Sequence, residues 1–381
     1  MSLRPARRVA GLRRTLIREI FESAPPDAVN LGLGQPDLRP PPELEQALAR
    51  AATGGPSGYG PTQGDPGLRE RVAASYGGFA RGAEDVLITT GCQEACFVAL
   101  GCLLDGGDEL LVPDPAFPGA ARAAQAFGAT VRGYPLEPGR GFHLDPGQVL
   151  GMIGPRTRAV VVISPSNPAG TVEPREVLDA LVTGTAERGV ALLLDDTYRD
   201  MHWLADGPAP GPPPEPVEHV VVCGGLSKSA ALTGWRVGWA VCSDREFMRR
   251  MVAFQQTVLT CAATPIQLAA RVAFEPEGRR GIERICRRFR ARRDLVEKAL
   301  PAERVRRAPL EGAFYAFVDA SAVGGGRVLA RTLLEQDGIV VIPGEAFGRT
   351  TAPFVRISYA QDERLLAPAL GTIAARLAGG A

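Results

Sequence analysis

Short apolar runs that alternate with amphipathic segments constrain the fold of this 381-residue chain more than any other feature. Residues 159–163 (Ala-Val-Val-Val-Ile) and 190–194 (Val-Ala-Leu-Leu-Leu) contain no polar side chain, which is typical of strands covered on both faces. The predicted elements are strands at 86–89, 109–112, 130–134, 159–163, 190–194, 220–222 and 237–241, with helices at 92–104, 118–127 and 174–188. Repeated strand–helix units predict an α/β fold with a mainly parallel, doubly wound sheet.

The last third of the chain has a different pattern. Residues 247–300 are mostly helical by periodicity, and strands are predicted at 314–318, 339–342 and 355–358 before a closing helix at 363–377. This indicates a second, smaller α+β domain. We expect residues 1–44 to form an N-terminal arm and part of the small domain, 45–275 the large domain, and 276–381 the small C-terminal domain. Helices are also predicted at 13–24, 43–52 and 68–76, and the proline-rich segment 206–216 is predicted to be a surface loop.

Composition excludes several classes of function. A net charge of +1 provides no field that would attract nucleic acid or an anionic membrane. No apolar stretch approaches the roughly 18 residues of a membrane span, and residues 1–16 lack the apolar run of a secretory signal. The seven cysteines have neither disulfide nor zinc spacing, and three histidines are too few for a histidine-based site. We therefore expect a reduced, cytoplasmic protein without a bound metal.

Residues 279–293 contain eight arginines. A nucleic-acid-binding helix is one interpretation. However, Ile282, Ile285 and Phe289 recur at helical spacing, which favours an amphipathic helix with a solvated basic face.

Lysine is rare in this chain. Only Lys228 and Lys298 occur, although Lys and Arg together number 43. Lys228 stands between two serines in a glycine-rich segment, and Arg236 follows eight residues later. Unlike arginine, lysine can lose its proton and become an amine nucleophile, as a carbonyl cofactor held through a Schiff base requires.

The residues around Lys228 also resemble a known signature. Ser-Lys-x-x-x-x-x-Gly-Trp-Arg-x-Gly at 227–238 is similar to the lysine motif of the class I/II aminotransferases, fold type I enzymes that use pyridoxal 5′-phosphate. The resemblance implies that Lys228 binds this cofactor and that Ser227 and Arg236 bind its phosphate. Thr-Gly-Cys-Gln-Glu-Ala at 90–95 opens a predicted helix, where free backbone N–H groups bind phosphate. It resembles the phosphate cup of the family, which assigns Gly91, Cys92 and Gln93 to the cofactor.

Asp195 follows an apolar strand, where an unpaired carboxylate would cost several kcal/mol. A protonated pyridine nitrogen would satisfy it and would keep the ring able to take up electrons. By resemblance, Tyr198 and Asn167 (in Ser-Asn-Pro-Ala-Gly) donate hydrogen bonds to the phenolic oxygen of the cofactor. Asp196 is a structural acid in the same pattern. Phe117 corresponds to the aromatic ring on the cofactor's face, although an ordinary core phenylalanine is the alternative.

The substrate residues are inferred in the same way. Arg356 lies in a predicted strand, and arginine grips a carboxylate with two parallel hydrogen bonds. By resemblance Arg356 binds the α-carboxylate of the substrate, with the backbone of Gly34 closing over it. Tyr59 corresponds to a tyrosine that reaches the phosphate in the neighbouring subunit, which implies a homodimer with shared active sites.

Three local departures from the family pattern concern substrate identity more than cofactor binding. Gly225 replaces a usual hydroxyl residue, Cys92 a small or hydroxyl residue, and Ala120 a frequent aromatic, which widens the pocket on that side. The sequence thus predicts an aminotransferase that acts on an amino acid and a 2-oxo acid. The alternatives are a related elimination, replacement or cyclisation enzyme, and a DNA-binding regulator with an aminotransferase-like domain. The regulator requires a winged-helix module, for which about thirty residues before Gly34 leave no room.

Overall fold

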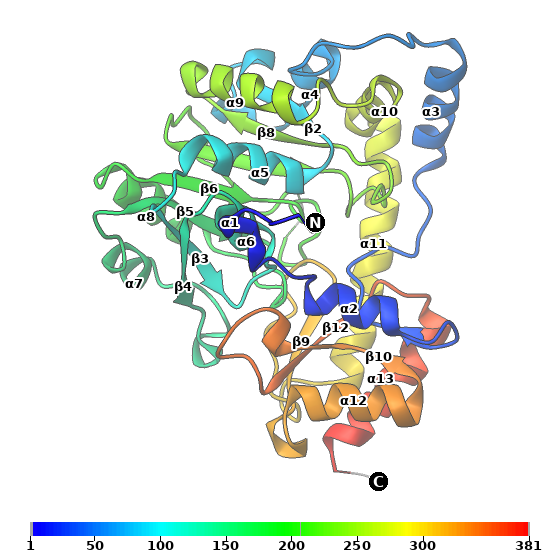
Figure 1. Cartoon of the computed structure of the whole chain (residues 1–381). Coiled ribbons are helices and arrows are strands. Elements are labelled where there is room, and N and C mark those ends of the chain that lie inside the picture. The colour runs from blue at the N-terminus through cyan, green and yellow to red at the C-terminus, as the bar shows by residue number, and fades with distance from the viewer. Residues whose placement is uncertain (1–2, 206, 380–381) are drawn as a thin grey trace.

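A seven-stranded sheet forms the centre of the computed structural model, which describes residues 3–205 and 207–379. The strands are β2 (Val86–Thr89), β3 (Glu109–Asp114), β4 (Thr130–Pro135), β5 (Thr157–Ile163), β6 (Ala191–Asp195), β7 (Val220–Gly225) and β8 (Gly238–Cys242). Their order is β2-β8-β7-β6-β5-β3-β4 (Figure 1). Only β8 runs antiparallel to its neighbours β2 and β7. The predicted, mainly parallel sheet is confirmed.

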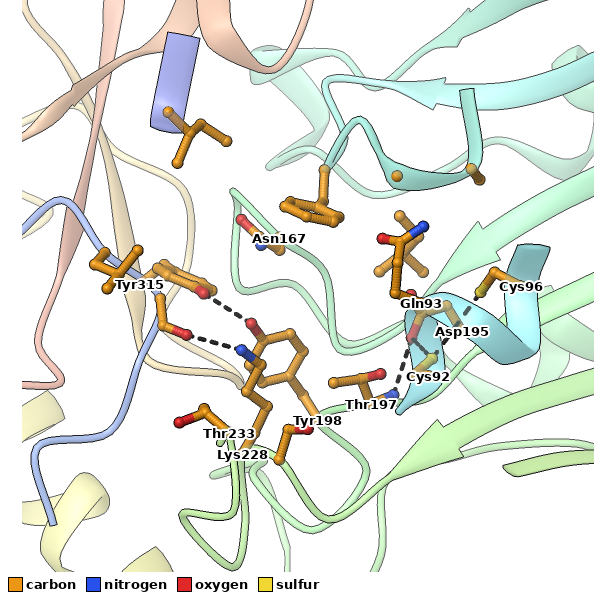
Figure 2. A pocket seen from close by; sticks show the side chains of 18 of the residues that line it. Cys92, Gln93, Cys96, Asn167, Asp195, Thr197, Tyr198, Lys228, Thr233 and Tyr315 are labelled. Carbon is orange, nitrogen blue, oxygen red and sulfur yellow. Dashed lines mark hydrogen bonds between the residues drawn. The ribbon is translucent and has the colours of Figure 1, made fainter. Parts of the chain in front are cut away.

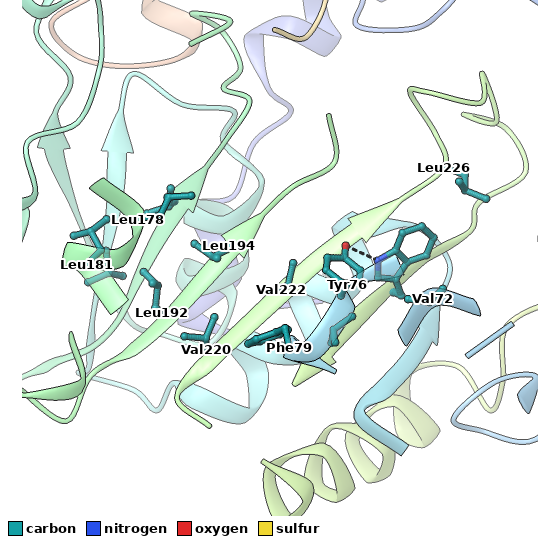
Figure 3. Packing of buried hydrophobic residues seen from close by; sticks show 14 of the residues in the cluster. Val72, Tyr76, Phe79, Leu178, Leu181, Leu192, Leu194, Val220, Val222 and Leu226 are labelled. Atoms are coloured by element: carbon teal, nitrogen blue, oxygen red, sulfur yellow. Dashed lines mark hydrogen bonds between the residues drawn. The ribbon is translucent and has the colours of Figure 1, made fainter. Parts of the chain in front are cut away.

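Helices cover both faces of this sheet. They are α4 (Pro66–Ser75), α5 (Cys92–Leu103), α6 (Gly119–Ala126), α7 (Pro146–Gly151), α8 (Arg175–Ala186) and α9 (Arg245–Val258). Successive side chains of a strand point to opposite faces, so Val160 belongs to an apolar cluster with residues of α4, α7 and α8, whereas Val161 belongs to another with residues of α5, α6 and α9. Figure 3 shows Leu178 and Leu181 of α8 against Leu192 and Leu194 of β6. The uninterrupted apolar runs 159–163 and 190–194 are explained by this double covering.

A second, antiparallel sheet has the order β11-β12-β9, and a two-stranded parallel pair joins β1 to β10. The strands are β1 (Val29–Asn30), β9 (Tyr315–Asp319), β10 (Ile339–Val340), β11 (Ile342–Pro343) and β12 (Phe354–Ser358). They pack against α11 (Pro276–Ala299), α12 (Gly326–Asp337) and α13 (Glu363–Leu377) in a separate apolar cluster. The segment 339–342, predicted as one strand, therefore contains parts of two short strands, β10 and β11, that belong to different sheets.

The N-terminal elements differ in detail from the prediction. The expected helices are α2 (Leu16–Ser23), α3 (Pro42–Gly54) and α4, and a further short helix is α1 (Arg7–Ala10). Further along the chain, α10 (Thr264–Ala270) lies in the stretch 247–300 that was predicted to be mostly helical. Met1 and Ser2, Asp206 of the proline-rich segment, and residues 380–381 lie outside the described residues. Among the described helices, none combines the length and apolar character that crossing a membrane requires.

The arginine-rich segment lies in α11, with Ile282, Ile285 and Phe289 buried as the amphipathic interpretation predicts. The prediction of a solvated basic face is wrong at Arg292, whose side chain is fully buried. Its guanidinium donates to Asp37 at 2.6 Å and to Glu363 at 3.0 Å. A buried cation is tolerated there because two carboxylates satisfy it.

Candidate active site

The predicted site residues come together at one edge of the large sheet. Asp195 ends β6, Lys228 follows β7 and Asn167 follows β5, so all three lie beyond the carboxyl ends of parallel strands. Because β8 is antiparallel, Arg236 reaches the same edge just before that strand begins. All the predicted site residues except Tyr59 and Gly91 line a single cavity, to which the second sheet contributes Arg356.

Lys228 is held inside this cavity. Its Nζ donates a hydrogen bond to the carbonyl oxygen of Gly34 at 2.8 Å (Figure 2). Burial, followed by the positive charges of Arg356 and Arg236, lowers the pKa of Lys228 to about 8. An amine with this pKa is partly unprotonated near neutral pH and can act as nucleophile or base.

Asp195 has only neutral donors as hydrogen-bond partners. Its Oδ1 accepts from the backbone N–H of Thr197 at 3.1 Å and from the thiol of Cys92 at 3.4 Å (Figure 2). Burial raises the pKa of Asp195, and the hydrogen bonds from Thr197 and Cys92 offset this only in part. Among the described residues no guanidinium or ammonium group forms an ion pair with this carboxylate. A cationic ring nitrogen would therefore be a favourable partner for it.

Asp196 points into a different network. Its Oδ2 accepts from the hydroxyl of Tyr76 at 2.8 Å, and Trp239 Nε1 donates to the same hydroxyl at 2.9 Å. This buried network is consistent with the predicted structural role of Asp196.

Gly91 and Arg236 lie together at the start of α5. Gly91 has φ +96°, and a Cβ at this position would collide with the guanidinium of Arg236. Arg236 itself has φ +58° and donates to the carbonyl of Thr233 at 3.0 Å. A helix N-terminus, a guanidinium and a glycine without a side chain form an arrangement that fits a phosphate group.

Arg356 is almost completely buried at 1% exposure. Its Nη1 donates to Asn167 Oδ1 at 2.8 Å and its Nη2 to the carbonyl of Gly32, whereas its buried Nε has no partner among the described residues. The guanidinium carbon lies 4.4 Å from the ring centre of Tyr315 and 4.6 Å from that of Phe347. These contacts fix the plane of the guanidinium.

Tyr198 forms a 2.7 Å hydrogen bond with the hydroxyl of Tyr315, and burial raises the pKa of Tyr198 well above its usual value. Tyr315 also explains the glycine at position 34, because a Cβ there would overlap the Tyr315 hydroxyl. Sequence reasoning did not identify Tyr315 or Thr197. Tyr315 could have been noticed as the one hydroxyl-bearing residue in the otherwise apolar run 314–318. Thr197 could not, because it contacts Asp195 through its backbone N–H, which every residue except proline has.

The remaining predicted residues are placed as follows. Ser227 and Gln93 line the cavity, and Phe117 lines it while its backbone N–H donates to the carbonyl of Asn167 at 2.9 Å. Tyr59 is not brought to the cavity, and its side chain is 90% exposed.

These residues fit pyridoxal phosphate. A half-buried amine (Lys228), a half-buried carboxylate that forms no ion pair with the described residues (Asp195), and a helix N-terminus with Gly91 beside Arg236 correspond to its aldehyde, its ring nitrogen and its phosphate.

The comparisons with known proteins agree with this geometry. The family model described as aminotransferase class I and II matches residues 26–373. The chain belongs to this family. It is 33% identical to the aspartate aminotransferase of Pyrococcus horikoshii, with 98% of this chain and 97% of the relative covered. It is 34% identical to the aspartate/prephenate aminotransferase of Thermus thermophilus, with 90% and 89% covered.

A solved structure of the Thermus thermophilus aspartate aminotransferase with maleate superposes with a TM-score of 0.91 at 31% identity, covering 99% of this chain and all of that one. The predicted family and fold type I architecture are confirmed. Class I/II aminotransferases depend on pyridoxal phosphate. This aminotransferase accordingly transfers an amino group between an amino acid and a 2-oxo acid.

Proposed function

We propose that Lys228, Asp195 and Arg356 are the residues that carry out this transfer. When bound, pyridoxal phosphate supplies an aldehyde that takes up the amino group and a ring that takes up electrons. The observation on which the proposal rests is the half-buried amine of Lys228, its pKa lowered to about 8, in a cavity that also contains the carboxylate of Asp195 and two guanidinium groups.

Lys228 has two roles in this proposal. Its amine would hold the cofactor as a Schiff base, and once displaced by the substrate it would move the proton at the substrate Cα. The lowered pKa supports the second role, because a base works best when its pKa lies near the working pH.

Arg356 would bind the substrate α-carboxylate through the part of its guanidinium that lacks a protein partner. The flanking rings of Tyr315 and Phe347 and the hydrogen bond to Asn167 support this role, since they restrict the direction from which a carboxylate can approach. Asn167 Oδ1 accepts a hydrogen bond from Arg356. The side-chain N–H groups of Asn167 would then donate to the phenolic oxygen of the cofactor. Tyr198 would be the second donor.

The other cofactor contacts are proposed from position. The backbone of Gly91, Cys92 and Gln93, with Ser227 and Arg236, would bind the phosphate. Phe117 would cover one face of the ring.

A single-turnover experiment tests the function. The chain loaded with pyridoxal phosphate and given one amino acid, without a 2-oxo acid acceptor, should release about one equivalent of 2-oxo acid per site and then stop. Continuous release of ammonia, beyond one equivalent, would instead favour elimination.

Uptake of pyridoxal phosphate by the apo chain should accelerate as the pH rises through about 8. Lys228 is a cation below its pKa and a free amine above it, and burial and the charges of Arg356 and Arg236 lower that pKa to about 8. Stopped-flow absorbance at a series of pH values measures the midpoint. Replacing Arg236 with Met should move the midpoint upward, since one of the charges that lower this pKa is removed. A midpoint near the ordinary lysine value of 10.5 would contradict the proposed environment.

We further propose a homodimer with shared active sites, in which Tyr59 contacts the phosphate of the partner's cofactor. The 90% exposure of Tyr59 supports this, because a tyrosine ring so exposed on one chain is free to pack against a second copy. Sedimentation at twice the mass of one chain tests it.

The division into an N-terminal arm (1–44), a large domain (45–275) and a small domain (276–381) also remains a proposal, supported by the start of α11 at Pro276. Limited proteolysis tests these boundaries. A cytoplasmic location is supported by the seven free thiols, which a reducing compartment preserves. Fractionation of the source cells tests it.

A further inference from the structure

Two thiols and a carboxylate meet in the wall of the cavity. Cys92 Sγ lies 4.0 Å from Cys96 Sγ and 3.4 Å from Asp195 Oδ1 (Figure 2). One ligand atom from each of the three residues lies within 4.8 Å of the other two, and the described residues contain no second group of His, Cys, Asp or Glu arranged in this way. All three residues line the cavity, so a small ion can reach them from it.

The fold explains why these side chains meet. Cys92 is the first residue of α5 and Cys96 follows four residues later, so both thiols lie on the same face of the helix. Asp195 ends β6, and this strand packs against α5. The cysteine spacing did not predict a metal site, because Asp195 lies 103 residues from Cys92 along the chain.

The separations are close to those of ligands on one tetrahedral ion. Zn²⁺ binds sulfur at about 2.3 Å and carboxylate oxygen at about 2.1 Å, which places two sulfurs about 3.8 Å apart and a sulfur and an oxygen about 3.6 Å apart. The observed 4.0 Å between the sulfurs and 3.4 Å between Cys92 and Asp195 differ from these values by about 0.2 Å. The third pair, Cys96 and Asp195, lies within 4.8 Å, and a rotation of one side chain would close it.

A disulfide between Cys92 and Cys96 is the alternative use of the two thiols. Their sulfurs are 4.0 Å apart, about twice the S–S bond length of about 2.05 Å. Both side chains project in the same direction from one helix, so a bond between them would distort the first turn of α5. An ion spans the gap with little change, and the geometry therefore favours a metal.

The donor set does not depend on a second copy of the chain. Cys96 is 4% exposed, and all three ligands come from α5 and β6 of the same chain. A fourth tetrahedral position would face the cavity, where water can fill it as in open zinc sites. Thiolate ligands select Zn²⁺ over Mg²⁺ and Ca²⁺, which prefer oxygen.

We propose that the chain without its cofactor binds one Zn²⁺ ion through Cys92, Cys96 and Asp195. Each thiol releases its proton to solvent as its sulfur binds the ion, the carboxylate binds as an anion, and no atom changes oxidation state. In the proposed function the carboxylate of Asp195 faces the ring nitrogen of pyridoxal phosphate. The ion and the cofactor therefore exclude each other, and this consequence rests on the proposed function, whereas the metal site itself does not.

Equilibrium dialysis of the cofactor-free chain against Zn²⁺ alone tests the site. We expect about one equivalent of Zn²⁺ per chain and no binding of Mg²⁺. Cd²⁺ in place of Zn²⁺ should produce the near-ultraviolet charge-transfer absorbance of metal–thiolate bonds. A chain that binds no Zn²⁺ would overturn the proposal and leave the aminotransferase function intact.

Substitution of single cysteines assigns the ligands. Cys92→Ser and Cys96→Ser should each weaken Zn²⁺ binding by at least about 100-fold, since loss of even an outer partner of a metal ligand costs about 10–100-fold. Cys102→Ser removes a thiol from the same helix outside the cavity and should leave the affinity unchanged. Far-UV circular dichroism establishes that the variants are folded, and Cys92, which is half-buried, can be replaced even if buried Cys96 cannot. Wild-type affinity in folded Cys92→Ser would contradict the site.

The cofactor separates this inference from the proposed function. Holoenzyme is dialysed first, so that unbound pyridoxal phosphate does not itself bind the metal. It should then bind Zn²⁺ at least about tenfold more weakly than the cofactor-free chain, because each ligand lowers the apparent affinity of the other. Equally tight Zn²⁺ binding by the holoenzyme, still lost in Cys92→Ser, would support the metal site and refute the placement of Asp195 at the ring nitrogen.

Discussion

Replacing Lys228 with Ala should reduce amino-group transfer by at least about 10⁴-fold, the largest effect expected of any single substitution in this chain. Lys228 provides the primary amine of the cavity, and in the proposed function the same Nζ both holds the cofactor and moves the substrate proton. A neighbouring arginine cannot replace it, because a guanidinium does not serve as an amine nucleophile. The measurement is the single-turnover yield of 2-oxo acid with an excess of amino acid.

The chain provides a matched control, since Lys298 is its only other lysine. Lys298 lies exposed in the last turn of α11 and does not line the cavity, so Lys298→Ala should retain full activity. Borohydride reduction of the holoenzyme followed by peptide mass analysis should find the cofactor attached at position 228 and not at 298. Near-wild-type turnover of Lys228→Ala would refute the assignment.

A site residue could be predicted from the sequence where a local pattern or motif marks it. Asp195, Asn167 and Lys228 follow apolar strands, and strand ends at one edge of a parallel sheet meet in space, so pattern and motif together located them. The apolar runs themselves predicted the sheet, because strands covered on both faces consist mainly of consecutive apolar residues.

Contacts between distant segments were not predictable in the same way. Tyr315 approaches Tyr198 and Gly34 only after the second sheet packs against the large one, and no spacing in the sequence carries that information. Arg292 was assigned to a solvated face because its partners, Asp37 and Glu363, lie 255 and 71 residues away along the chain. Long-range charge pairing of this kind is a property of the folded chain.

Replacing Asp195 with Asn should lower amino-group transfer by about 10³-fold while leaving the fold intact. The substitution keeps an oxygen that can accept from the Thr197 N–H and the Cys92 thiol, but it removes the negative charge that would keep a ring nitrogen protonated. Asp195→Glu retains the charge on a longer side chain and should be less impaired. Asp179→Asn, on the exposed face of α8, changes the same functional group in a surface ion pair and serves as the control.

Thermal unfolding provides a second measurement, which distinguishes a role of Asp195 in cofactor binding from a purely structural role. Burial raises the pKa of Asp195, which means that without a cationic partner the fold destabilises the charged carboxylate. Apo Asp195→Asn should therefore have a Tm equal to or higher than that of the apo wild type. Added pyridoxal phosphate should raise the Tm of the wild type more than that of the variant, since binding stabilises in proportion to affinity. A variant that is destabilised as apoprotein but gains the full Tm increase with cofactor would contradict this role, because Asp195 would then support the fold and not the ring nitrogen.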